Sequence, residues 1–384
     1  MRKLIKLEKK LNILFDNEIY EYLNPDYVYL PIYDGFELLK KQDDKVLINE
    51  IVVENKLNKI KSPISGVIKG TTFLNIYNKK TKCVVIENTY EEKEKINNKN
   101  VTLTRANIIS TLSENNYLSF AKMLENKNIK NLIINGMEDE PYIQNNPFIL
   151  KKYANKLLKL IDDFVNIFQI DNAFISIKSN DTDNINLFLS KIGTYPKINL
   201  SLINDYYLLA QDYFLLENMN LSNEDSLVIS ASDLYKIYKL LNDELSYTTF
   251  VSIVSPFLPK SFVVNVKNGS LIKDVLKKLN IKNFDNALYI CNGLMTGYEI
   301  DPDKEVITEN TKGLIITNKD TFKEEKCNLC GMCYKICPVK VNPKKVMDTG
   351  IKSKSCIDCG LCSYICPCKI NLRKYLRSEK WMFI

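Results

Sequence analysis

The chain has 384 residues, more than the ~250–300 at which a single hydrophobic core stops growing, so about two to four domains are expected. Its apolar content of 45% and charged content of 26% are typical of globular proteins. It contains no histidine, which excludes general acid–base catalysis by imidazole, imidazole zinc sites and Rieske-type ligation.

The net charge of +7 is concentrated at the C-terminal end of the chain, since residues 320–384 hold 13 Lys and Arg against 6 Asp and Glu. Iron-bound thiolates would offset part of that charge, so nucleic acid is not an expected partner. The longest uncharged apolar run, 245–259, falls short of the ~20 residues that a membrane span needs. Without a recognisable secretory signal, the expected location is cytoplasmic, with peripheral attachment at the inner face of the cell membrane allowed.

Short β-rich runs separated by turn signals occupy the first part of the chain. This spacing is typical of a small all-β domain, which we assign to residues 1–90. A charged, Asn-rich stretch from Thr89 to Asn100 is the predicted linker. The expected strands are Tyr27–Pro31, Val46–Ile48, Ile51–Val53, Ser62–Ile68 and Cys83–Ile86.

Buried strands then alternate with helices, which predicts an α/β domain at residues 101–220. The strands are expected at Asn131–Asn135 and Ala173–Ile177, and the helices near Ile149–Phe168 and Asn184–Ile192.

A β-grasp-like module is predicted at residues 225–318. Its expected strands are Leu227–Ser230, Phe250–Val254, Ser261–Val266 and Ala287–Cys291. Its expected helices lie near Leu234–Leu241 and Leu271–Leu279.

The last segment, 320–377, holds a duplicated run of four cysteines, each followed by proline. The spacing C-x₂-C-x₂-C-x₃-C-P is the bacterial ferredoxin signature for two [4Fe–4S] clusters, in which the fourth cysteine of each run ligates the other cluster. Two structural zinc sites are the alternative, but zinc uses two cysteine pairs rather than two triplets. The predicted ligands are Cys327, Cys330, Cys333 and Cys366 for cluster 1, and Cys356, Cys359, Cys362 and Cys337 for cluster 2.

The remaining residues of the cysteine-rich segment also carry predictions. Gly331 and Gly360 are expected to form tight turns that bring backbone N–H groups toward sulfur. Cys83, Cys291 and Cys368 are interpreted as small core residues rather than ligands.

In this order the elements resemble the C subunit of the Rnf electron-transport complex. The Ser62–Gly66 turn is similar to that family's lipoyl-like barrel-sandwich, and Asn135–Tyr142 to its N-G-x-E-C-E-P-Y segment. Asn292–Gly297 and Lys369–Arg377 match further segments. The resemblance implies a multidomain α+β protein: a β barrel-sandwich, an α/β domain like the complex I flavoprotein subunit, a β-grasp-like (SLBB) module and a ferredoxin-like 2x[4Fe–4S] domain.

The family also implies FMN and NADH bound against a glycine-rich loop, in which backbone without Cβ approaches the pyrophosphate. Here the corresponding residues, 108–117, contain no glycine, and the family's Y-P-x-G-G-E reads Tyr195–Leu200 without glycine. We therefore predict that the flavin and nucleotide site is lost or remodelled. Glu138 and Glu140 would be its ligand-facing acids if a site survives, and turn or helix-start carboxylates otherwise.

The leading hypothesis is an iron–sulfur protein that relays single electrons within an oxidoreductase or ion-translocating complex, with Rnf-like membrane subunits or a soluble reductase as redox partners. One alternative is an NADH- or flavin-dependent subunit with a rebuilt cofactor loop. Another is a structural adaptor whose clusters only stabilise the fold.

Overall fold

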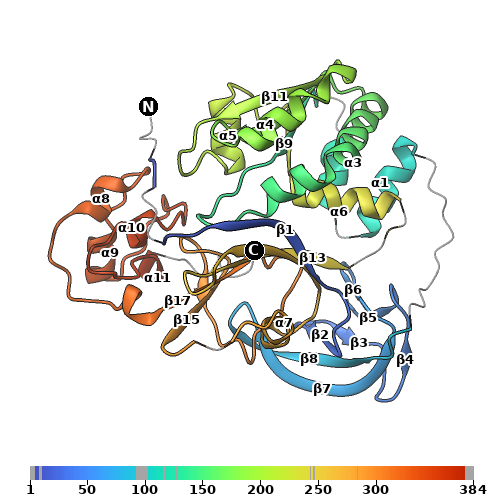
Figure 1. Ribbon diagram of the computed structural model, residues 1–384, viewed down its shortest axis with the longest axis horizontal. Helices are drawn as coiled ribbons and strands as arrows, with labels where there is room; N and C mark the ends of the chain where they lie inside the picture. The colour runs from blue at the N-terminus through green and yellow to red at the C-terminus, as the bar shows by residue number, and fades with distance from the viewer. Residues whose placement is uncertain are drawn as a thin grey trace.

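The structure is a computed structural model that describes residues 5–7, 11–91, 103–115, 117–125, 129–242, 244, 247–282 and 284–376. Most of the predicted linker and Arg377 of the family-like closing segment lie outside these residues. In Figure 1 an α/β unit lies at the top, β-sheets fill the centre and lower right, and the cysteine-rich segment lies at the left. Within the described residues, no helix combines the length and apolar character needed to cross a membrane.

The N-terminal β-rich region forms two antiparallel sheets. Valine and isoleucine side chains from both sheets share one core, which includes Val28, Val53, Ile68 and Val84. One sheet has the order β2-β8-β7-β4, formed by Tyr27–Ile32, Lys79–Asn88, Gly66–Ile76 and Lys45–Val46. The other has the order β3-β5-β6, formed by Glu37–Leu38, Ile51–Glu54 and Lys59–Lys61.

The expected strand at Ser62–Ile68 begins later than predicted, because Ser62–Ser65 form a buried turn. Ser62 Oγ donates to the carbonyl of Ile64 at 2.6 Å, which closes the turn locally. Strand β7 starts at Gly66, where a Cβ would lie 2.3 Å from the carbonyl oxygen of Glu87. Glycine is therefore required for the close approach of β8 at this point.

A six-stranded mixed sheet forms the centre of the molecule, and its first strand differs from the sequence-based domain boundaries. Strand β1 (Phe15–Tyr22) lies inside the region assigned to the N-terminal β domain, yet it pairs in parallel with β14 (Ser261–Lys267). Helix α7 (Ile272–Lys278) packs in this sheet's core. The sheet order is β1-β14-β13-β17-β15-β16, completed by Thr248–Val254, Gly313–Asn318, Ala287–Cys291 and Tyr298–Glu299.

The α/β unit is a four-stranded parallel sheet of order β11-β10-β9-β12. Strand β9 (Asn131–Asn135) is buried along its whole length, as expected for a central parallel strand. Strand β12 (Ser226–Ser230) pairs with β9, so the predicted boundary between residues 220 and 225 cuts through this sheet. Strand β10 (Asn172–Lys178) lies between β9 and β11 (Ile198–Ile203), so β11 and β12 are the outer strands.

Helices cover the α/β sheet, and α3 (Asn145–Phe168) is the longest. It starts four residues before the predicted Ile149, because Pro147 lies in the first turn, where its missing N–H costs nothing. The other helices are α1 (Arg105–Glu114), α2 (Leu118–Glu125), α4 (Thr182–Leu189), η1 (Ile192–Thr194), α5 (Asp212–Asn218) and α6 (Ala231–Leu241). The loops that follow β9, β10 and β11 meet at one edge of the sheet.

The cysteine-rich segment consists of short helices that repeat in order. Gly331 and Gly360 begin the first helix of each repeat with φ of +69° and +73°, as expected for tight turns that need glycine. In Figure 1 the first repeat lies toward the outer edge and the second toward the body. The helices are η2 (Lys319–Phe322), α8 (Met332–Ile336), α9 (Pro343–Thr349), α10 (Leu361–Tyr364) and α11 (Arg373–Leu376).

Candidate iron–sulfur centre and adjoining cavity

The two cysteine runs are packed against one another so that each fourth cysteine lies near the other run. Burial raises the pKa of the Cys333 thiol, and the charges of Cys366 and Cys330 raise it further. Burial likewise raises the pKa of Cys359 to about 11, with further contributions from Cys337 and Cys356. Cys366 packs in one cluster with Cys327 and Cys333 of the first run, and Cys337 lines a cavity together with three cysteines of the second run.

A small cavity lies among the cysteines of the proposed second quartet. Cys337, Cys356, Cys359 and Cys362 all line it. Apolar side chains such as Val341 and Leu376 close its sides. The backbone N–H of Val341 donates to Cys337 Sγ at 3.3 Å, the type of bond that orients a thiolate ligand. The set of four cysteine donors fits a [4Fe–4S] cluster.

The thiols of the second run are poor ligands until a metal stabilises the thiolate. Burial is the largest cause that raises the pKa of Cys362 to about 12, and it also raises the pKa of Cys356. A metal ligand must be deprotonated, so cluster binding would be coupled to the release of these protons. Within the described residues, no three side chains of the His, Cys, Asp or Glu types converge as they do around a single metal ion.

The three other cysteines are buried away from such a role, as predicted. Cys83 and Cys291 lie in separate cores of the β-sheets, and Cys368 lies in the core of the cysteine-rich segment. Burial raises the pKa of Cys83 to about 11 and of Cys291 to about 12, which keeps both thiols protonated and unreactive.

A buried ion pair within the cysteine-rich segment, which the sequence did not reveal, holds Arg373 in position for a contact with the body. Arg373 Nε and Nη2 bind the two carboxylate oxygens of Asp358 at 2.7 and 2.6 Å. The two side chains are only 9% and 13% exposed. Arg373 Nη1 also donates to the carbonyl of Thr296 at 2.5 Å. One guanidinium therefore joins the loop between Cys356 and Cys359 to the loop between β15 and β16.

Two further contacts hold the second run close to the body. Tyr207, which follows β11, donates its hydroxyl to the carbonyl of Cys359 at 2.5 Å. The backbone of Gly360 approaches the loop between β15 and β16 so closely that a Cβ would lie 2.0 Å from the carbonyl oxygen of Met295. Leu361 and Tyr364 complete the contact by packing in one apolar cluster with Met295 and Tyr207.

Glu140, in the loop after β9 of the α/β unit, binds the same loop between β15 and β16. Its carboxylate accepts from the backbone N–H groups of Met295 at 2.9 Å and Thr296 at 2.7 Å, and from the Thr296 hydroxyl. Burial raises the pKa of Glu140 to about 7 despite these donors. Asn292–Gly297, the segment similar to the family's G-G-P-M-M-G, thus connects Glu140 with Arg373.

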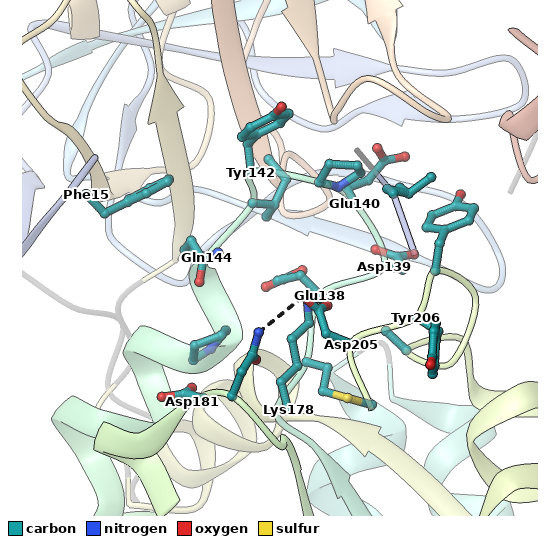
Figure 2. A pocket seen from close by; sticks show the side chains of 18 of the residues that line it. Phe15, Glu138, Asp139, Glu140, Tyr142, Gln144, Lys178, Asp181, Asp205 and Tyr206 are labelled. Carbon is teal, nitrogen blue, oxygen red and sulfur yellow. Dashed lines mark hydrogen bonds and ion pairs between the residues drawn. The ribbon is translucent and has the colours of Figure 1, made fainter. Parts of the chain in front are cut away.

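Glu138 lies two residues earlier and points to the opposite side of the loop after β9 (Figure 2). Its carboxylate accepts from the N–H of Asn146, near the start of α3, at 2.7 Å. Burial raises its pKa to about 7, although Lys312 acts in the opposite direction. The interpretation of Glu138 as a helix-start carboxylate therefore matches its contact, while Glu140 is a bridge between loops.

A cavity of about 380 Å³ lies beside Glu138, at the edge of the sheet where β9, β10 and β11 end. Tyr207 and Tyr364 also line it, so it adjoins the contact with the second cysteine run. Asn184 contributes a buried Oδ1 that accepts no hydrogen bond among the described residues. The carboxylates of its wall are Glu138, Asp139, Glu140, Asp181, Asp183 and Asp205.

This wall does not fit the phosphate of a flavin mononucleotide. Its six carboxylates outnumber its three lysines, two of which already pair with Asp183 and Asp205, and carboxylates repel phosphate. No glycine occurs among the described residues that line the cavity. Residues 105–114, at the place of the family's glycine-rich loop, form helix α1 instead. Gly136, in the loop after β9, is required for packing, since a Cβ there would lie 2.2 Å from Leu150 Cδ1.

Two family models match the chain. The model described as "Nuo51 FMN-binding domain" matches residues 103–225, and the model described as "4Fe-4S dicluster domain" matches residues 319–367. The dicluster match covers all eight predicted ligands. The prediction of two [4Fe–4S] clusters is thereby confirmed, and the α/β unit is similar to the flavoprotein domain of the complex I type.

Curated relatives are named as the C subunit of ion-translocating oxidoreductase complexes. The relative from Buchnera aphidicola is 23% identical over 84% of this chain and 75% of its own length. The relative from Acetobacterium woodii, the C subunit of a Na⁺-translocating ferredoxin:NAD⁺ oxidoreductase complex, is 20% identical over 58% of this chain and 53% of its own length. The relative from Actinobacillus succinogenes is 23% identical over 57% of this chain, which spans only 33% of that protein. The expected resemblance to the C subunit of the Rnf complex is confirmed.

Among solved structures, an NAD⁺-reducing [NiFe]-hydrogenase in the H2-reduced state has a similar fold. The TM-score is 0.50 at 10% identity, and the match covers 72% of this chain and 63% of that one. At this identity the likeness concerns the fold alone.

Proposed function

We propose that this chain is an iron–sulfur electron-transfer subunit of an ion-translocating oxidoreductase complex. The observation that carries the proposal is a dicluster domain in which one cysteine run is fixed to the body by Arg373 and Tyr207. The names of the relatives that resemble the chain over more than half its length support the complex. Each bound cluster would accept and donate one electron.

The proposed ligand sets are crossed between the two runs. Cluster 1 takes Cys327, Cys330, Cys333 and Cys366, and cluster 2 takes Cys356, Cys359, Cys362 and Cys337. The packing of Cys366 in one cluster with Cys327 and Cys333 supports the first set. The cavity lined by all four thiols of the second set supports the other.

The two proposed cluster sites differ in how deeply they are buried. Cys362 is buried, and Tyr207 bonds the backbone of Cys359 while it also lines the large cavity. Cys330 is exposed at the other end of the pair. Cluster 2 is therefore the one closer to the body, and cluster 1 is the one that a protein partner can approach. Rnf-like membrane subunits or a soluble reductase are the proposed partners.

The finer domain assignments are part of the same proposal. We infer a barrel-sandwich for the two small sheets and an SLBB-type module for the six-stranded sheet with α7. Peripheral attachment to a membrane partner would follow from the resemblance to the Rnf C subunit.

The ligand sets can be tested by replacing the fourth cysteine of each run with alanine. In protein purified without oxygen, Cys337→Ala should disturb the cluster bound by Cys356, Cys359 and Cys362, and Cys366→Ala the other one. EPR spectra and iron and sulfide analysis distinguish the two. Damage confined to the cluster nearest in sequence would contradict the crossed sets, and zinc or far fewer than about eight irons per chain would overturn the function.

A second candidate function is a flavin- or NADH-dependent oxidoreductase subunit with a rebuilt site. The match of residues 103–225 to a "Nuo51 FMN-binding domain" favours it. Flavin absorbance in the purified protein, or bleaching of the clusters by NADH, would support this candidate. A purely structural adaptor would be rejected if both clusters cycle reversibly in a redox titration.

A further inference from the structure

The two cysteine runs have equivalent positions offset by 29 residues, as Cys327 is to Cys356. Non-ligand positions of the second run make the contact with the body. Gly360 meets Met295, Asp358 binds the Arg373 side chain that donates to Thr296 of the body, and Leu361 is only 1% exposed. The same face of the first run is open. A Cβ on Gly331 would meet no atom within 4 Å.

The open face of the first run carries apolar side chains at positions whose equivalents in the second run contact the body. Leu329 is equivalent to Asp358 and is 75% exposed, and Met332 is equivalent to Leu361 and is 38% exposed. Tyr334, next to them, is 50% exposed. Three large apolar side chains within six residues of an exposed cysteine are typical of a protein contact rather than of a solvated surface.

The charge around this face is strongly positive. We call residues 326–354 the first-run lobe. It holds seven lysines and one acidic residue, Asp348, which pairs with Lys344. Among the described residues, none of the other six lysines takes part in an ion pair: Lys326, Lys335, Lys340, Lys345, Lys352 and Lys354.

We propose that the open face of the first-run lobe, centred on Leu329, Met332 and Tyr334, binds an acidic one-electron redox protein next to cluster 1. The inference rests on the proposed function, because it assigns the protein partner to one end of the cluster pair. Positive charge at the rim steers an acidic partner toward the face, and the apolar centre excludes water once the partner is bound. A second copy of this chain would present the same positive charge and is disfavoured.

The test is binding of the anaerobic holoprotein to a small acidic [2Fe–2S] ferredoxin, measured by calorimetry in both the native and a redox-inactive, gallium-substituted form. Binding should weaken about tenfold or more between low and moderate salt. Charge reversal by K335E, K340E and K352E together should weaken it about a hundredfold. K277E and K278E, at two exposed lysines on the solvent side of α7, are the control and should leave it within about twofold.

A second variant tests the apolar centre without strain in the backbone. Leu329 has a φ of +58°, a conformation that asparagine tolerates. L329N should therefore retain iron and weaken binding about tenfold at every salt concentration. A basic c-type cytochrome should not bind.

Several outcomes would overturn the inference. The first is that the acidic ferredoxin does not bind, and the second is that the α7 control loses as much affinity as the first-run variants. The third is that a basic cytochrome or a duplex oligonucleotide binds as tightly as the ferredoxin. The fourth is that the protein self-associates through this face. In each case full iron content with reversible cluster titration would leave the electron-transfer function standing. Loss of the clusters themselves would instead contradict the proposed function.

Discussion

The two cysteine runs have the same ligand spacing and opposite surroundings. In the second run, Gly360, Leu361 and Tyr364 are buried, whereas the equivalent Gly331, Met332 and Lys335 of the first run are exposed. Arg373, which clamps Asp358, is equivalent to Lys344, which pairs with the exposed Asp348. The comparison teaches that cysteines determine which cofactor binds, and that the residues between them determine what each cluster faces.

Among the changes considered, removal of the Arg373 cation should have the largest effect on the free energy of unfolding. Arg373→Met removes the guanidinium that binds the buried Asp358 carboxylate, which should lower the free energy of unfolding by about 3–5 kcal/mol. Lys344→Met, at the equivalent position, should lower it by less than about 1 kcal/mol because that pair is exposed. Anaerobic denaturant unfolding measures both. Equal losses would mean that the two runs are not held differently.

The pH dependence of stability should report Glu140, which anchors the loop that receives the second run. Its pKa is raised to about 7 from 4.5, so the folded state binds a proton that the unfolded state releases. Burial raises the pKa of Glu138 to the same value, so the two carboxyls together should make stability fall as the pH rises from about 4.5 to about 7, and the share of Glu140 is on the order of 3 kcal/mol.

Glu140→Gln is the variant that isolates this carboxyl, since it stays neutral at every pH. It should flatten the decline in stability between about pH 4.5 and 7 by roughly one carboxyl's share. Glu244→Gln, an exposed carboxyl, serves as the control and should leave the profile unchanged. A wild-type profile that rises through this range would contradict the assignment.

Alanine substitution of the equivalent glycines Gly331 and Gly360 should lower stability by different amounts. Both have positive φ, so each substitution costs about 1–2 kcal/mol in backbone strain. At Gly360 the new methyl group would also collide with Met295, which adds about 1–3 kcal/mol, whereas at Gly331 it meets open space. Thermal unfolding of the holoproteins measures the difference. An equal effect at both glycines would mean that the second run is not in close contact with the body.

The smallest expected effect comes from Tyr207→Phe. It removes the hydroxyl that donates to the Cys359 carbonyl and should cost about 1 kcal/mol. Tyr334→Phe, in the open first run, should cost nothing measurable because that ring is half exposed. A redox titration should show a change in the potential of cluster 2 only in the Tyr207 variant, whereas a change in cluster 1 would contradict the proposed contact.

The sequence by itself determined the cluster type, the α/β alternation and most strands of the molecule. The cysteine spacing is local, and so are the alternating or continuous apolar patterns that predicted β9, β10 and β15. Gly331 and Gly360 were likewise readable, because a tight turn between nearby ligands requires glycine.

Only the tertiary structure decided which cysteine run is buried and how the domains join. The pairing of β1 with β14, the Arg373 contact with Thr296 and the Tyr207 contact with Cys359 link residues that are 77 to more than 200 positions apart. No local pattern specifies such a pair, because hydrophobic periodicity and turn residues report a residue's own segment and not its distant partner. The two cysteine runs therefore look alike in sequence and differ only in what the folded chain places against them.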